Sequence, residues 1–145
     1  MTNADVLEVS LHIAAEPETV FPFFTDPLRY AQWRGNSATL DPVPGGVYRV
    51  QMRDGVEATG EFVEIDPPRR IVFTWGWTSR FAVAPGSTRV VVTLEDENGG
   101  TRVTLRHYDL PDDEQRAQHR KGWELYFDRL RVRVLGGDPG PDPNG

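Results

Sequence analysis

Two strand-like runs joined by a proline turn, within residues 60–77, constrain the fold of this chain more than any other segment. The sequence there is GEFVEIDPPRRIVFTWGW, with the turn at Asp66-Pro67-Pro68-Arg69. Side chains of a strand alternate between two faces. One face of the second run therefore collects four bulky apolar residues, Ile71, Phe73, Trp75 and Trp77. Such a face needs either a thick cover or a cavity that it lines.

The remaining patterns predict more strands and a few helices. Alternating apolar residues predict a first strand over 6–14, and Pro17 begins the first of two short helical segments, which Pro22 kinks or shortens. Turn signals such as Asp54-Gly55 and Asn98-Gly99 separate a series of antiparallel strands. The series of strands is expected to begin at Ser37. The individual ranges that the turns delimit are 47–52, 56–65, 70–77, 88–95 and 101–108. The order of elements predicts an α+β architecture.

One long amphipathic helix is expected from about Asp113 to Leu135. Its core-facing stripe has helical spacing and consists of His119, Trp123, Tyr126, Phe127, Leu130 and Val134. The alternating arginines 129, 131 and 133 near its end are interpreted as a solvated helix terminus rather than a phosphate site. The aromatic residues of this stripe and those of the strand 70–77 are expected to bound a space between helix and sheet.

Composition narrows the classes of function. The 145 residues predict a single domain over 1–135, followed by a disordered tail over 136–145. Cysteine is absent and the net charge is −6, which argues against thiol chemistry, thiolate metal sites and broad nucleic-acid binding. No signal peptide pattern or apolar run of membrane-spanning length occurs, so a cytoplasmic location is expected.

Several short motifs, in their order and spacing, resemble the START-like (SRPBCC, helix-grip or pollen-allergen-like) superfamily. Within it the chain is similar to the family named after the activator of the heat-shock-protein-90 ATPase. The resemblance runs from about Val9 to Leu130. The motifs are Pro17-Glu18-Thr19-Val20, Thr25-Asp26-Pro27, Trp33, Pro44-Gly45-Gly46, Gly60 to Trp75, Gly99-Gly100-Thr101 and Gly122-Trp123. Arg34, where many relatives have a bulky apolar residue, and Pro22 depart from the pattern near one end of the expected cavity.

The resemblance implies a curved sheet of about seven strands gripping the C-terminal helix, with two short helices after the first strand. It also implies a cavity between sheet and helix that holds a hydrophobic or amphipathic molecule. The residues expected at that cavity are Phe24, Trp33, Met52, Phe73, Trp75, Trp77, His107, His119, Trp123, Tyr126 and Phe127.

The leading hypothesis is a non-enzymatic carrier or sensor of a small hydrophobic molecule, such as a lipid or an aromatic or polyketide-like compound. No catalytic residue, cofactor or metal ligand stands at a diagnostic spacing. Two alternatives stay open: a chaperone-interacting module related to the ATPase activator, and a cyclase-like or hydrolase-like enzyme using His107 or His119. A homodimer is compatible with either.

Overall fold

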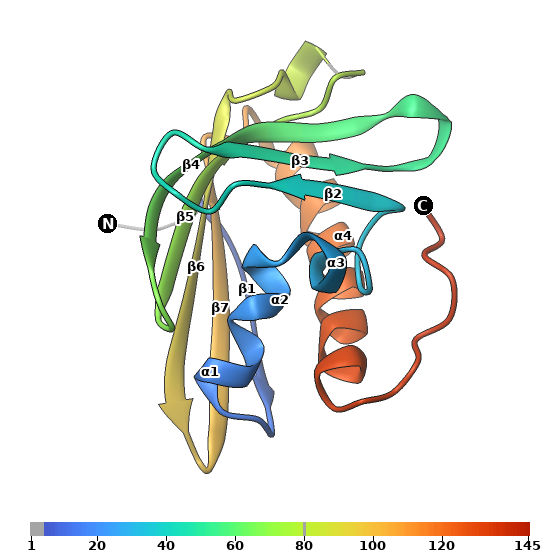
Figure 1. Cartoon of the computed structure of the whole chain (residues 1–145). Helices are drawn as coiled ribbons and strands as arrows, with labels where there is room; N and C mark the ends of the chain where they lie inside the picture. Colours follow the sequence, from blue (N-terminus) through green and yellow to red (C-terminus); the bar gives the residue numbers. More distant parts are fainter. Residues whose placement is uncertain (1–4, 80) are drawn as a thin grey trace.

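An antiparallel sheet carries most of the chain, which a computed structural model describes over residues 5–79 and 81–145. Within those residues seven strands lie in the order β1-β7-β6-β5-β4-β3-β2. The sheet curves around one long helix (Figure 1). The strands are β1 (Leu7–Ile13), β2 (Ser37–Leu40), β3 (Val47–Gln51), β4 (Glu57–Asp66), β5 (Arg70–Trp75), β6 (Thr88–Glu97) and β7 (Gly100–Tyr108). This topology confirms the predicted α+β helix-grip architecture.

Strand β4 changes its pairing partner halfway, which bends the sheet. Residues 57–61 pair with β3, and residues 62–66 pair with β5. The change falls next to Gly60, where a Cβ atom would lie 1.9 Å from the carbonyl oxygen of Thr74. Only a residue without a side chain permits that approach. The bend lets the end of β5 and the β3–β4 hairpin close around the same end of the long helix.

Three one-turn helices follow β1 where the sequence predicted two. They are α1 (Pro17–Val20), α2 (Pro22–Thr25) and α3 (Pro27–Tyr30), and each begins with a proline. Pro22 has no backbone N–H to donate, so it ends the first helix and starts the next one. The side chain of Asp26 caps α3 by accepting a hydrogen bond from the Leu28 amide at 2.9 Å.

The long helix α4 spans Asp113–Val134, close to the predicted range. Asp112 caps its first turn by accepting from the Gln115 amide at 2.8 Å. The predicted stripe is buried from His119 to Leu130, whereas Val134 is only half-buried. The described residues also form the 3-10 turns η1 (Arg53–Gly55) and η2 (Phe81–Val83). None of the described helices is long and apolar enough to cross a membrane.

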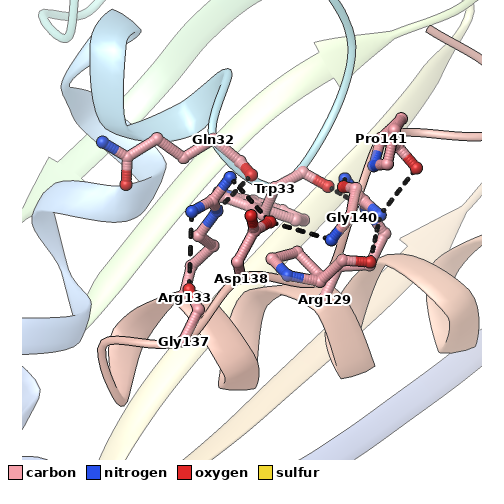
Figure 2. Close-up of polar contacts among 9 residues, drawn as sticks. Gln32, Trp33, Arg129, Arg133, Gly137, Asp138, Gly140 and Pro141 are labelled. Atoms are coloured by element: carbon pink, nitrogen blue, oxygen red, sulfur yellow. Dashed lines mark hydrogen bonds and ion pairs between the residues drawn. The ribbon is translucent and has the colours of Figure 1, made fainter.

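Arg129 was expected at a solvated helix end, but its side chain is 7% exposed and lies against the main chain of two other segments. Its Nε donates to the Trp33 carbonyl at 3.0 Å, and its terminal nitrogens donate to the carbonyls of residues 139–141 at 3.0–3.4 Å. Figure 2 shows this arrangement and the neighbouring contacts of Arg133. The interpretation of Arg129 as a solvated cation was wrong, because carbonyl oxygens replace the water around its guanidinium.

Residues 136–145, expected to be a disordered tail, return along α4 toward β2 (Figure 1). The Asp142 carboxylate accepts from the Gly35 amide at 2.6 Å and from the Tyr126 hydroxyl at 2.9 Å. The Asn144 carbonyl accepts from the Arg53 amide at 2.9 Å. The structure differs from the expectation because this segment meets buried polar donors, which its own composition does not reveal.

Candidate functional site

A cavity of about 400 Å³ opens between the end of β5, the β3–β4 hairpin and the N-terminal half of α4. One part of its lining is aromatic and the other is polar. The lining residues are Arg34, Met52, Arg53, Asp54, Val56, Trp75, Trp77, Gln118, His119, Gly122, Trp123, Tyr126 and Asn144. Its size and mixed lining are typical of a small-molecule site.

Two elements build the aromatic wall. Trp75 ends β5, and Trp77 follows two residues later on the same side. Trp123 and Tyr126 come from the buried face of α4, where a spacing of three residues keeps them adjacent. The ring centroid of Trp75 lies 4.8 Å from that of Trp77 and 6.0 Å from that of Trp123. The wall offers flat apolar surface to a molecule that enters the cavity.

His107 is buried behind this wall in a single tautomer. The Trp123 indole N–H donates to His107 Nδ1 at 3.1 Å, so the ring proton sits on Nε2. That Nε2–H donates to the Thr88 hydroxyl at 2.8 Å, and the hydroxyl donates to the Trp75 carbonyl at 2.6 Å. Burial, and then the neighbouring His119 and Arg34, lower the pKa of His107 to about 3. The ring is therefore neutral at physiological pH, with both nitrogens engaged.

His119 lines the cavity beside His107, with the two ring centroids 5.8 Å apart. Its Nδ1–H donates to the Gln115 carbonyl at 2.7 Å, and its Nε2 accepts from the Trp77 indole at 3.0 Å. The sequence placed these two histidines across a shared space, and the structure brings them together. Neither ring nitrogen of His107 is open to the cavity for proton transfer, and each nitrogen of His119 already has a partner.

Arg34 enters the cavity from the segment after α3 and is only 2% exposed. Four aromatic rings surround its guanidinium, whose Cζ lies 4.9 Å from the Trp123 centroid and 5.2 Å from that of Tyr126. The centroids of Trp75 and Trp77 are both 5.7 Å away. Rings at these distances attract a cation through their π faces.

Two tyrosine hydroxyls complete the surroundings of Arg34. Its Nη1 donates to the hydroxyls of Tyr30 and Tyr48, each at 3.3 Å, and these hydroxyls also bond to each other. Burial by itself would lower the pKa of Arg34, but Tyr30 and Tyr48, and then Tyr126, raise it above its ordinary value. Burial raises the pKa of Tyr48 well above 10 and that of Tyr126 to about 12. At neutral pH the guanidinium is therefore a cation, and the hydroxyls of Tyr48 and Tyr126 near it are neutral.

The predicted cavity residues divide into two groups. Six of them line the cavity: Met52, Trp75, Trp77, His119, Trp123 and Tyr126. The other five lie in the packed interior: Phe24, Trp33, Phe73, His107 and Phe127. Phe73 stacks on Tyr48 at 4.2 Å, and Phe24 contacts Trp33 at 5.4 Å. These five residues belong to the buried interior between sheet and helix and do not line the cavity.

The polar part of the lining was not foreseen as a site. Arg34 stood out in the sequence only as a departure from related chains, and nothing indicated that it turns inward. Gly35 has a φ of +79°, and a Cβ there would lie 2.8 Å from the Gln51 carbonyl. This tight turn fixes the direction in which Arg34 leaves the backbone. Asn144 reaches the cavity only because the tail folds back. In the described part of the chain, no three His, Asp or Glu side chains cluster as metal ligands do.

The model of one protein family matches most of this chain. Its description is "Activator of Hsp90 ATPase homolog 1-like protein", and the match covers residues 14–134. A search of curated proteins gives no match.

Solved structures share the fold. An AHSA1-like protein from Rhizobium etli is 38% identical, with a TM-score of 0.74 over 95% of this chain and 86% of that one. DynU16, a protein in the dynemicin biosynthetic locus, is 27% identical with a TM-score of 0.81. The alignment covers 93% of this chain but 49% of DynU16, so the chain spans about half of that protein. The Aha1 dimer from Colwellia psychrerythraea, at 17% identity and a TM-score of 0.79 over 93% of this chain and 98% of that one, shares the fold.

Proposed function

The chain belongs to the family of Activator of Hsp90 ATPase homolog 1-like proteins, and from its cavity we propose that it binds one small amphipathic molecule as a carrier or sensor. The observation that carries this proposal is the aromatic cavity of about 400 Å³ between β5 and α4. An apolar cavity with a few polar groups at fixed positions is the usual form of a small-molecule site. A biosynthetic-locus protein among the structural neighbours supports a small-molecule role.

The state of the two histidines supports binding rather than catalysis. A general base must offer a free lone pair to the substrate, at a pKa near the working pH. Nδ1 of His107 already accepts from Trp123, and the pKa of His107 is about 3. Nε2 of His119 accepts from Trp77. A cyclase-like or hydrolase-like mechanism through these rings would first have to break those hydrogen bonds.

Titration with N-phenyl-1-naphthylamine, an uncharged fluorescent aromatic probe, tests the proposal directly. We expect saturable binding at one site, checked by native mass spectrometry as a 1:1 complex. Val56→Trp places a large side chain at the cavity lining and should weaken binding about tenfold or more, because it fills space that the probe needs.

Val63→Trp is the matched control, because Val63 lies on β4, the strand that begins directly after Val56, is 45% exposed and does not line the cavity. Its affinity for the probe should equal that of the wild type. Absence of saturable binding to the wild type, or an equal loss in both variants, would contradict the proposal.

A chaperone partner is the second candidate, because the family description refers to activation of the Hsp90 ATPase. The test is the ATPase rate of purified Hsp90 with and without this protein. Stimulation that Val56→Trp leaves intact would assign the chaperone role to a surface other than the cavity, and an unchanged rate would remove this candidate.

A further inference from the structure

Arg34 is a buried charge that no described carboxylate neutralises. Among the residues that the structure describes, no carboxylate lies within 4 Å of its guanidinium, although ten other ion pairs are found. Its Nε is buried and has no hydrogen-bond partner in the part of the chain that the structure describes. Among residues 5–79 and 81–145, the hydrogen-bond acceptors of Arg34 are the hydroxyls of Tyr30 and Tyr48, which both lie at the long distance of 3.3 Å from Nη1. The guanidinium therefore has unused donors and an unneutralised charge.

Burying an arginine in this way is costly. A guanidinium loses several kcal/mol of hydration in a dry site, and neutral hydroxyls and π faces replace only part of that. Natural interiors rarely leave such a group unpaired, so each case needs an explanation. Arg34 also lines the cavity, so its charge lies beside the space that a bound molecule would occupy.

The surroundings of Arg34 restrict what the partner can be. The rings of Trp75, Trp77 and Trp123 stand on the same cavity, within 6 Å of the guanidinium carbon. A molecule whose anionic group meets Arg34 would lay its apolar body against these indoles.

We propose that the cavity selects an organic anion, an aromatic or aliphatic acid whose carboxylate or sulfonate bonds to Arg34 while its apolar part packs on the tryptophans. This rests on the proposed function and adds the chemical class of the ligand to it. A planar guanidinium suits a two-oxygen acceptor, because two parallel N–H donors match the spacing of its oxygens. The charge of Arg34 repels cations, and an anion gains a charge pair that an uncharged ligand of the same shape does not.

Two fluorescent probes that differ only in the charged group test this proposal. They are 8-anilinonaphthalene-1-sulfonate and N-phenyl-1-naphthylamine, which lacks the sulfonate. In Arg34→Met we expect the affinity for the sulfonate to fall roughly tenfold to a hundredfold, the range of a hydrogen-bonded charge pair. The affinity for the uncharged probe should stay within about threefold of the wild type, since Met keeps the apolar bulk.

Controls keep the outcome interpretable if a variant folds poorly. Arg131→Met removes an exposed arginine of α4 that pairs with Asp128, and it should leave both affinities unchanged. Arg34→Lys keeps the charge without the planar fork and should give an intermediate affinity for the sulfonate. Circular dichroism melts of every variant exclude unfolding as the cause.

The outcomes separate the two proposals. Loss of sulfonate binding with retention of the uncharged probe supports an anion site at Arg34. Wild-type binding of both probes that Arg34→Met does not change overturns the anion site and leaves the proposed binding function standing. If the wild type binds neither probe, both the anion site and the proposed binding function are overturned.

Discussion

Arg34 and Arg129 are both buried, one 2% and the other 7% exposed, but their surroundings are opposite. Arg129 donates to four main-chain carbonyls, three of them in the C-terminal tail. Arg34 has four rings and two long hydrogen bonds to hydroxyls, and it lines a cavity. Both side chains are tied to the turn after α3, because Arg129 bonds to the carbonyl of the residue that precedes Arg34.

The difference separates a structural cation from one available to a ligand. Arg129 donates hydrogen bonds to carbonyl oxygens that would otherwise lack donors. Its removal therefore leaves several polar groups unpaired. Removing Arg34 takes away a charge that has no ion-pair partner among the described residues, so little is lost from the folded state. The following four experiments test this distinction, from the largest expected effect to the smallest.

Arg129→Met should have the largest effect on stability, a loss of about 3 kcal/mol in the free energy of unfolding. The reason is that four carbonyls lose their donor at once. Urea denaturation at pH 7 measures it. Arg131→Met, which removes only an exposed ion pair, should change stability by less than about 0.5 kcal/mol. Equal losses in the two variants would show that Arg129 is not the structural anchor described above.

Acid should destabilise the fold through His107, which is a neighbour of Arg34 and not of Arg129. The folded-state pKa of about 3 lies below the ordinary 6.5, so below pH 6.5 the unfolded chain binds the proton first. Stability is therefore fully present above pH 6.5 and falls by about 1.4 kcal/mol per pH unit as the pH drops toward 3. Between pH 6.5 and pH 5 this amounts to about 2 kcal/mol.

Urea denaturation of the wild type and of His107→Gln at several pH values isolates this contribution. Glutamine does not titrate, so the pH dependence should be shallower in the variant, and the carboxylates common to both proteins cancel in the comparison. Parallel curves for the two proteins would contradict a buried neutral His107.

Removal of the tail after Leu135 should cost about 1–2 kcal/mol, less than Arg129→Met, because water can replace the lost carbonyls around a newly exposed Arg129. A double-mutant cycle sharpens the comparison. In the shortened chain, Arg129→Met should lose much of its effect, whereas the effect of Arg34→Met should not change. Additive effects of the truncation and Arg129→Met would mean that Arg129 does not hold the tail.

Arg34→Met should have the smallest effect on stability, within about 1 kcal/mol of the wild type, since loss of cation–π contacts is offset by relief of the buried charge. The same change should raise the pKa of His107, because Arg34 is the third contributor to its lowered value after burial and His119. Urea denaturation and NMR titration of the histidine measure these two results. A stability loss as large as that of Arg129→Met would make Arg34 structural and weaken its assignment to a ligand.

Local patterns predicted one half of the site well and the other half poorly. Alternation in β5 and helical spacing in α4 placed Trp75 and Trp123 on facing surfaces, because those periods report directly which face is buried. The same patterns did not distinguish Trp75, which lines the cavity, from Phe73, which is packed against Tyr48. Both residues lie on the same face of β5. Whether protein or open space lies opposite each one depends on its position along the strand relative to α4.

The charged residues were the least predictable, since an arginine is expected in water unless a partner is known. The partners of Arg129 are carbonyls from segments up to 96 residues away in sequence, and backbone carbonyls leave no trace in residue identity. The tail looked disordered for the same reason: its few apolar side chains do not hold it, but its carbonyls and Asp142 do.

The sequence alone determined the series of antiparallel strands, the long C-terminal helix and the two opposed aromatic surfaces, because these follow from short-range periodicity and turn chemistry. Its motifs also indicated the family. Only the tertiary structure decided which residues of those surfaces pack against protein and which line a cavity. The position of Arg34 at the cavity, the hydrogen bonds of Arg129 to the tail and the histidine tautomers were likewise visible only in the tertiary structure. These features depend on contacts between distant segments, where the loss of water around each polar group is balanced by a partner that no local pattern specifies.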